Sequence, residues 1–325
     1  MRALAGTAHG AAVSKPHVPS PPKLALPMNA LYRDWFLATR PWSFTMTFIS
    51  VSVGSALAAL EGAFSWLFYL LTLLGAICMH AGCNLVNDYE DVRSGVDDPN
   101  VPTACYRPHP LMENRLTPRQ VRNAAYLLYL FACLIGFYLT YERGPVVLWL
   151  GIIGVLAGIA YTAPPFSYKY KGLGEFSVFL MWGPLMVTGA YYVQRQAISL
   201  EAILISIPFG ALVALVLLAN NIRDINYDRS KGIRTLAILL GARGGIALYL
   251  GLIVAAYIAI AIMSVIGPLK PWSLLVLLSL PLAIKLLKQM KREVPLDADA
   301  QTAKLDTAFG MLLLISLLIG SRIWQ

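Results

Sequence analysis

Two clusters of asparagine and aspartate interrupt an otherwise apolar sequence. One extends from Asn84 to Asp91 and the other from Asn220 to Asp228. Helical residues three or four positions apart share a face, so each cluster would direct several side-chain oxygens to one side of a helix. Mg²⁺ prefers such oxygens and commonly combines one or two carboxylates with substrate phosphates. The pattern therefore predicts a site where Mg²⁺ ions clamp a diphosphate. The predicted metal ligands are Asp88, Asp91, Asp224 and Asp228.

Basic residues accompany both clusters. A departing diphosphate needs positive charge as its bond to carbon breaks, and Arg and Lys supply it together with a metal ion. Each basic residue has an alternative explanation, because Lys and Arg also collect in cytoplasmic loops for topological reasons alone. Acidic residues contribute little to membrane topology, so the paired Asn/Asp clusters are the stronger indication of a diphosphate site. The side chains predicted to contact the diphosphate are Asn87, Asn220, Asn221, Arg223, Lys231 and Arg107.

His80 is a further polar residue, about one helical turn before Asn84. Its position would allow contact with an acceptor molecule. The alternative is a packing or hydrogen-bonding role, which is the commoner one for a lone histidine in a membrane helix, and we favour that alternative.

The elements that must position these residues are membrane helices. The chain has 325 residues, of which 58% are hydrophobic and 13% are charged, whereas soluble domains carry about 25% charged residues. Nine stretches lack any Asp, Glu, Lys or Arg, and seven of them are near or above the ~18–20 residues that span a bilayer. We predict an all-α, multi-pass membrane bundle of nine transmembrane helices. The nine stretches are 43–60, 62–86, 123–140, 144–168, 176–193, 202–219, 244–266 and the shorter 271–284 and 308–321.

Basic residues are distributed unevenly across the predicted spans. With nine spans, all but four of the 26 lysines and arginines fall on the side of the N-terminus; the four are Arg143, Arg195, Lys270 and Arg322. This asymmetry follows the positive-inside rule and predicts that the N-terminus and both Asn/Asp clusters face the cytoplasm. It also explains the net charge of +9 without nucleic-acid binding, so no nucleic-acid partner is expected. We interpret residues 1–34 as a disordered cytoplasmic tail and residues 35–325 as one membrane domain.

Five motifs, in order along the chain, resemble the UbiA superfamily of intramembrane aromatic prenyltransferases. They are Arg40–Phe44, Asn84–Asp91, Leu173–Glu175, Gly189–Gln194 and Arg234–Ala237. The resemblance covers most of the chain after residue 35. It is strongest to the menaquinone-type branch, which prenylates 1,4-dihydroxy-2-naphthoate. It implies nine helices, Mg²⁺ as cofactor, and an isoprenyl diphosphate, an aromatic acceptor and the lipid bilayer as partners.

The resemblance also implies roles for individual residues. Both Asn/Asp clusters match the family's two Asp-rich motifs, while Tyr161 and Lys169 match a loop pair that the family places beside the diphosphate. We therefore expect four catalytic residues: Asp91, Asp224, Lys169 and Tyr161.

Two departures from the family pattern concern the first motif and the loop that follows it. Many relatives have another Asp four residues after the first motif, whereas this chain has Gly95, with Asp97 beyond it. The stretch Tyr106–Pro110 also differs from the naphthoate branch. These departures leave the acceptor open, with 4-hydroxybenzoate, a chlorophyllide or glycerol phosphate as alternatives.

A membrane transporter is the alternative from a different class. It would place acidic residues near the middle of the spans, where they coordinate a moving ion. The two clusters instead lie at span ends among basic residues, which favours diphosphate chemistry.

Overall fold

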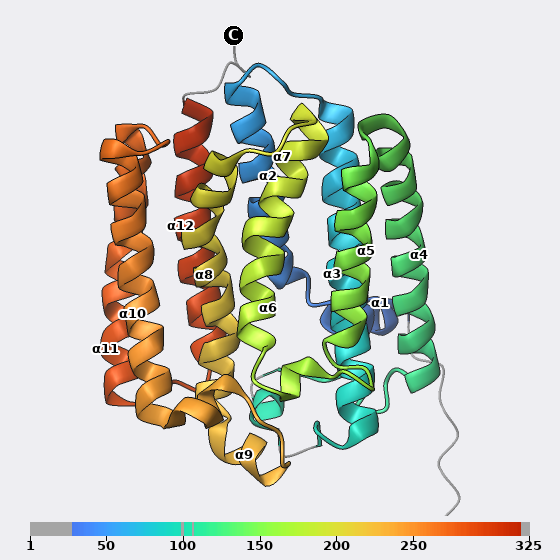
Figure 1. Cartoon of the computed structure of the whole chain (residues 1–325). Coiled ribbons are helices and arrows are strands. Elements are labelled where there is room, and N and C mark those ends of the chain that lie inside the picture. The colour runs from blue at the N-terminus through green and yellow to red at the C-terminus, as the bar shows by residue number, and fades with distance from the viewer. Residues whose placement is uncertain (1–27, 99–100, 106, 320–325) are drawn as a thin grey trace, which may run out of the picture.

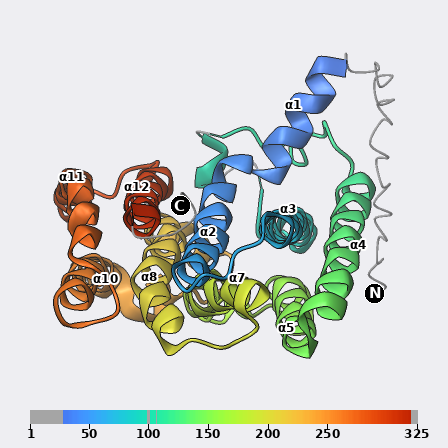
Figure 2. The same cartoon turned by 90° about the horizontal axis from the view of Figure 1, so that it is seen from above.

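The computed structural model describes residues 28–98, 101–105 and 107–319. Over these residues the chain folds into helices that run side by side as one bundle (Figures 1 and 2). An isolated bridge between Lys171 and Arg234 is the only strand-like pairing in this part of the chain. The prediction of an all-α bundle is confirmed.

The helices also agree with the predicted number of spans. In the described part, eight helical segments are long and apolar enough to cross a membrane, and the shorter apolar helix α5 (Pro145–Ala160) provides a ninth. The other main helices are α1 (Met28–Thr39), α2 (Phe44–Leu60), α3 (Trp66–Ser94), α4 (Pro118–Arg143), α6 (Gly174–Leu180), α7 (Met186–Arg195), α8 (Leu200–Arg223), α10 (Leu236–Ile266), α11 (Leu280–Arg292) and α12 (Ala298–Ile319). Short helical pieces join or extend them: η1 (Pro41–Ser43), η2 (Pro102–Cys105), η3 (Tyr168–Tyr170), η4 (Met181–Leu185), α9 (Ile225–Ser230) and η5 (Pro271–Ser279).

The two weakest predicted spans are longer than their uncharged stretches suggested. The candidate spans are Pro271–Arg292 and Ala298–Ile319. Lys285 and Lys288 are carried within α11, and Asp306 lies fully buried within α12. A charged residue therefore interrupts the uncharged run without ending the helix. Residues 320 and 321 of the second predicted stretch lie outside the described residues.

Helix α1 corrects one boundary of the predicted tail. The range 1–34 was expected to lack structure, but α1 begins at Met28, so the end of that range is helical. Its Asp34 is fully buried and accepts a hydrogen bond from Arg115 at 2.7 Å. This contact and the packing of Ala38 against the α3–α4 region attach α1 to the bundle. Residues 1–27 lie outside the described residues, so disorder there stays a prediction.

Local sequence explains where the helices that carry the site begin and end. Gly95 ends α3 in the left-handed conformation, with φ of 75°, which glycine adopts without strain. Thr117 and Gln120 form a reciprocal capping box at the start of α4, which satisfies amide groups that would otherwise lack partners. The first Asn/Asp cluster is therefore helical up to the turn that leads into the following loop.

The span that contains α6 and α7 is kinked in its middle. Gly183 has non-helical backbone angles and precedes Pro184, which removes a helical hydrogen bond. The backbone of Gly183 lies directly against Gly210 in α8, where an added Cβ would approach within 3.0 Å of the opposite backbone. Ser50 of α2 donates a 2.6 Å hydrogen bond to the carbonyl oxygen of Trp182 beside the kink. The kink therefore fixes the position of Trp182 next to the interior of the bundle.

Candidate active site

The two Asn/Asp clusters lie at the same end of the bundle. The first occupies the last turns of α3, and the second occupies the end of α8 and the short helix α9 (Figure 1). A hydrogen bond from the Tyr227 hydroxyl to the Val96 carbonyl, at 2.7 Å, joins the second cluster to the loop that follows the first. Residues far apart in the sequence therefore form one polar region, as the sequence predicted.

Asp88 of the first cluster is held by Arg40. The carboxylate is buried, and its Oδ1 accepts a hydrogen bond from the Arg40 guanidinium. Arg40 lies between α1 and η1 with φ of 55°, a left-handed conformation that is uncommon for a residue with a side chain. Asn84 donates to the Thr39 carbonyl at 3.0 Å and so attaches the same junction to α3. From the sequence, Arg40 was identified only as the first residue of the motif Arg40–Phe44.

Asp91 forms the centre of a second set of contacts. Lys169 Nζ lies 2.8 Å from Asp91 Oδ2 and 2.9 Å from Asn87 Oδ1, and the Tyr170 hydroxyl donates to Asp91 Oδ1. The Lys169 ammonium also lies 5.8 Å from the centre of the Tyr161 ring. The structure therefore brings four of the predicted site residues together: Asn87, Asp91, Tyr161 and Lys169.

Arg223 organises the second cluster. Its guanidinium donates to both oxygens of Asp224, at 2.6 Å each, and to Asn220 Oδ1 at 2.6 Å. It also reaches Asp299 in α12 at 3.0 Å and Thr103 in η2 at 3.0 Å. Such a forked arrangement is typical of arginine with planar acceptors. Arg223 therefore connects α8, α12 and the loop after α3.

Asp228 differs from the other aspartates of the two clusters. It is buried, and no hydrogen bond or ion pair joins its carboxylate to the described residues. Burial and the nearby Asp224 raise the pKa of Asp228 to about 7. Burial also raises the pKa of Asp224, although Arg223 opposes that shift. Burial is the main cause of both shifts, because a buried carboxylate loses the water that stabilises its charged form.

A divalent cation would stabilise these buried carboxylates in their charged form. Among the described residues, no three His, Cys, Asp or Glu side chains close around a common point. Mg²⁺ does not require such a cage, since it usually binds one or two carboxylates together with substrate phosphates and water. Asp91, Asp224 and Asp228 supply oxygens of the right kind, on both sides of the polar region.

The remaining predicted residues occupy different positions. Lys231 donates to Asp98 Oδ2 at 2.6 Å and to the Gly95 carbonyl at 2.9 Å, so in this structure it ties α9 to the loop after α3. Asn221 is buried and donates to Glu175 of α6 at 2.8 Å. Arg107 lies 5.7 Å from the centre of the Trp42 ring and borders the cavity described below. Their contacts with a diphosphate stay predictions.

Asp97 lies among the acidic residues of the two clusters, although it was not one of the predicted site residues. Its carboxylate lies close enough to the other acidic residues to raise the pKa of Asp224 and of Asp228. Its backbone N–H donates to the Asp91 carbonyl at 3.0 Å. Helical spacing could not place it, because the helix ends at Gly95 and a loop conformation brings Asp97 back.

A cavity of about 990 Å³ extends from these polar residues into the apolar interior. Lys169, Asn87 and Asn220 border its polar end, and apolar residues such as Leu139 and Val147 border it elsewhere. Residues from α2, α3, α4, α5, α7, α8 and α12 contribute to its wall. The cavity is therefore suited to a molecule with a charged head and a long apolar body.

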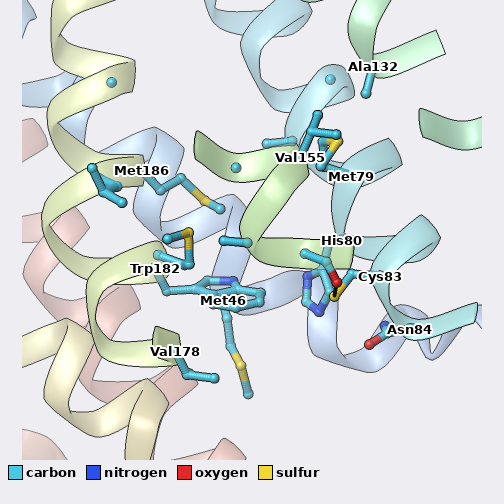
Figure 3. Close-up of a pocket in the computed structure, with 18 of the residues that line it drawn as sticks. Met46, Met79, His80, Cys83, Asn84, Ala132, Val155, Val178, Trp182 and Met186 are labelled. Atoms are coloured by element: carbon cyan, nitrogen blue, oxygen red, sulfur yellow. Dashed lines mark hydrogen bonds between the residues drawn. The ribbon is translucent and has the colours of Figure 1, made fainter. Parts of the chain in front are cut away.

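The middle of the cavity wall carries aromatic and sulfur-containing side chains (Figure 3). His80 and Trp182 lie there in a T-shaped contact, with ring centres 4.8 Å apart. His80 Nδ1 is 2.8 Å from the Thr47 hydroxyl, and its Nε2 is 3.2 Å from the Ser43 hydroxyl. His80 is therefore a hydrogen-bonded packing residue, as favoured from the sequence, and it also borders the cavity.

Comparison with known proteins agrees with this arrangement. The model of the UbiA prenyltransferase family matches residues 47–314. The chain is 31% identical to a 1,4-dihydroxy-2-naphthoate octaprenyltransferase of Bacillus subtilis, over 87% of this chain and 91% of that protein. It is 34% identical to the UbiA prenyltransferase domain-containing protein 1 of Dictyostelium discoideum, over 88% of this chain and 87% of that protein.

Solved structures show the same fold. A UbiA homologue from Aeropyrum pernix K1 matches with a TM-score of 0.62 at 17% identity, covering 86% of this chain and 98% of that one. A UbiA homologue from Archaeoglobus fulgidus, described as bound to DMAPP and Mg²⁺, matches with a TM-score of 0.58 at 14% identity, covering 87% and 99%. The family match, the curated relatives and the shared fold lead to one conclusion: the chain is an integral membrane prenyltransferase that belongs to the UbiA prenyltransferase family.

Proposed function

We propose that this enzyme transfers an isoprenyl group from a prenyl diphosphate to 1,4-dihydroxy-2-naphthoate, with Mg²⁺ bound at the diphosphate. The observation that carries the proposal is the continuity of one cavity from Asn87, Lys169 and Asn220 into an apolar interior. The acceptor is supported by the names of the relatives from Bacillus subtilis and Escherichia coli, which are both called 1,4-dihydroxy-2-naphthoate octaprenyltransferases. The donor and the metal are supported by the Archaeoglobus fulgidus homologue described as bound to DMAPP and Mg²⁺.

The acidic residues of the polar region would hold the metal. Asp91 and Asp88 would contribute from α3, and Asp224 and Asp228 from the end of α8 and from α9, with Asp97 beside them. Mg²⁺ bound there would offset the negative charge of the diphosphate as it departs. The buried, mutually repelling carboxylates fit this role because a cation relieves their repulsion.

The protein's own groups would prepare the donor for reaction. The Lys169 ammonium, beside Asn87 and Asp91, would donate to a diphosphate oxygen, and Asn220 would bind from the opposite side. Fixed donors of this kind stabilise charge that develops in the transition state. Tyr161 and Trp182 border the cavity, where their ring faces would stabilise cationic character at the allylic carbon.

The reaction exchanges one bond for another. The bond between the allylic carbon and the diphosphate oxygen breaks, and the electron pair leaves with the diphosphate. The aromatic ring carbon that bears the carboxylate then forms a bond to the allylic carbon. A naphthoate acceptor restores its aromatic ring by losing carbon dioxide. An acceptor whose attacking carbon carries a hydrogen instead loses a proton.

We also propose that the polar end of the cavity faces the cytoplasm. The distribution of basic residues supports this orientation, because all but four of the 26 lysines and arginines fall on that side of the nine predicted spans. The diphosphate head would then enter from the cytoplasm while the prenyl chain stays in the apolar interior and the surrounding lipid.

The test is product formation from defined substrates. Membranes that contain the protein are incubated with Mg²⁺, prenyl diphosphates of several lengths and a panel of acceptors, and the products are identified by mass. We expect a prenylated naphthoquinol whose mass reflects loss of carbon dioxide. Product from 4-hydroxybenzoate, a chlorophyllide or glycerol phosphate, with none from the naphthoate, would refute the acceptor assignment.

A further inference from the structure

His109 directs a buried N–H group into the polar region without a hydrogen-bond acceptor. The side chain is 6% exposed. Its Nδ1 accepts a hydrogen bond from the backbone N–H of Met112 at 3.3 Å, so in the neutral ring the hydrogen is carried by Nε2. Nε2 has no hydrogen-bond partner in the described part of the chain. A buried donor without an acceptor is uncommon and calls for an explanation.

Two carboxylates flank this nitrogen at similar distances. Nε2 lies 3.8 Å from Asp88 Oδ2 and 3.7 Å from Asp97 Oδ2. Both distances exceed the 2.7–3.2 Å of an N–H···O hydrogen bond, so a shift of about 1 Å by either carboxylate would complete one. The imidazole therefore lies beside the acidic residues proposed to hold the metal and forms no hydrogen bond with them in this structure.

The two carboxylates are not equivalent. Asp88 already accepts a hydrogen bond from Arg40 through its other oxygen. For the Asp97 carboxylate, His109 is the only side chain among the described residues within ion-pair distance. His109 is therefore the candidate donor for Asp97, which lies two residues beyond Gly95 in the loop after α3.

The backbone around His109 is tightly held. Its N–H donates to Glu113 Oε1 at 2.9 Å, and Glu113 Oε2 pairs with Arg115 at 2.6 Å. Arg115 in turn binds the buried Asp34 of α1. Leu111, in the same turn, is buried in the apolar cluster that includes Ala38 and Leu85. The imidazole is thus attached to a turn that several contacts hold in place. Hydrogen bonds also hold the backbone on either side of Asp97, so a rotation of the Asp97 side chain would bring the two groups together.

We propose that His109 is a positioning residue for Asp97: its Nε2–H binds one carboxylate oxygen of Asp97 and turns the other toward the divalent cation. This inference rests on the proposed function, because it assigns Asp97 to the metal. Partners that orient a metal ligand in this way commonly change metal affinity by about 10- to 100-fold when they are replaced. His109 itself does not ligate the cation, since its Nε2 carries the hydrogen.

The test compares two replacements that retain different nitrogens. In His109→Gln the side-chain amide nitrogen can occupy the position of Nε2, whereas the amide of His109→Asn reaches only the position of Nδ1. Binding of Mn²⁺ to the purified full-length protein is measured by electron paramagnetic resonance, with an unreactive prenyl thiolodiphosphate present. We expect the affinity for Mn²⁺ to fall about 10- to 100-fold in His109→Asn and to stay within about threefold of the original in His109→Gln. Unchanged affinity in His109→Asn, or an equal loss in both variants, would overturn the inference.

A double-mutant cycle tests whether His109 acts through Asp97. We expect Asp97→Asn to weaken Mn²⁺ binding by itself, and His109→Asn to add nothing further in the Asp97→Asn background. Independent, additive losses would show that His109 acts on another group and would refute the inference. Asp97→Asn does not alter the turn that contains His109. Its effect on Mn²⁺ binding can therefore still be measured if His109→Asn lowers the thermal stability of the protein.

The outcome can be separated from that of the proposed function. Mn²⁺ binding that depends on His109 and Asp97, in a protein that forms no product with any acceptor, would refute the proposed reaction and leave this inference standing. Normal prenyl transfer with unaltered Mn²⁺ affinity in His109→Asn would refute this inference and leave the proposed reaction standing.

Discussion

Replacing Lys169 with methionine removes the cation that contacts both Asn87 and Asp91. Methionine keeps most of the length of the side chain but has no charge and no N–H group. The Lys169 side chain is 17% exposed, so solvent offsets little of the loss. Removing one preorganised donor to developing negative charge costs about 2.7–4 kcal/mol, or about 10²–10³-fold in kcat. Asn220 and the metal ion would still act on the diphosphate, so we expect the lower end of that range, about 10²-fold.

The metal dependence makes this prediction specific. Loss of the ammonium leaves Asp91 with fewer cations around it, which favours a metal ion at that carboxylate. We therefore expect kcat to fall while the Mg²⁺ concentration for half-maximal rate stays the same or decreases. A rise in that concentration with an unchanged kcat would contradict a direct role of Lys169 at the diphosphate.

Lys171 provides the matched control. It is exposed, lies two residues further along the same loop and contributes the same charge to the positive-inside asymmetry. Rates are measured with radiolabelled prenyl diphosphate in membranes that hold equal amounts of each variant. We expect Lys171→Met to keep at least about half of the activity. Equal losses in Lys169→Met and Lys171→Met would refute the reasoning, because the lysines would then serve topology alone.

Four further outcomes are expected. Asp224→Ala abolishes prenyl transfer without loss of membrane-inserted protein, which activity and membrane extraction assays measure together. Chelation of divalent cations stops the reaction, and added Mg²⁺ restores it. Gly151 lies in the cavity wall, where an added Cβ would contact no other atom within 4 Å. We expect Gly151→Leu to fill cavity space and to slow transfer of long prenyl chains more than transfer of geranyl. Gly251 is equally open but lies away from the cavity, so Gly251→Leu has no such effect. Arg115→Ala leaves the buried Asp34 without its cation, and we expect the protein to be about 3–5 kcal/mol less stable in thermal unfolding.

The main features of the fold follow from local sequence patterns. A run without charges predicts a span because each charged residue in the bilayer is costly, and this reasoning gave nine helices. It underestimated α12, where Asp306 is buried within the helix. It also did not detect α1, since the apolar and polar residues of that helix alternate around its surface and form no uncharged run.

Sequence patterns likewise identify some residues of the candidate site and miss others. Asp91 and Asp224 could be selected from their spacing, because helix geometry alone turns the residues of each cluster to one side. Arg40, Asp97 and His109 could not, because their positions depend on loops and on a left-handed residue between two helices. Such contacts join segments distant in sequence, and no local pattern encodes them.

The pairing of charges within each cluster has a consequence for how the protein is made. Asp88 and Asp91 find their cations, Arg40 and Lys169, within the first 169 residues of the chain. Asp224 binds Arg223, its neighbour in sequence. During synthesis, Asp88, Asp91 and Asp224 can therefore pair with their cations before the chain is complete, which avoids the large cost of isolated buried charges at these positions. Contacts that join the two clusters, such as the hydrogen bond from Tyr227 to Val96, can form only when both segments are inserted.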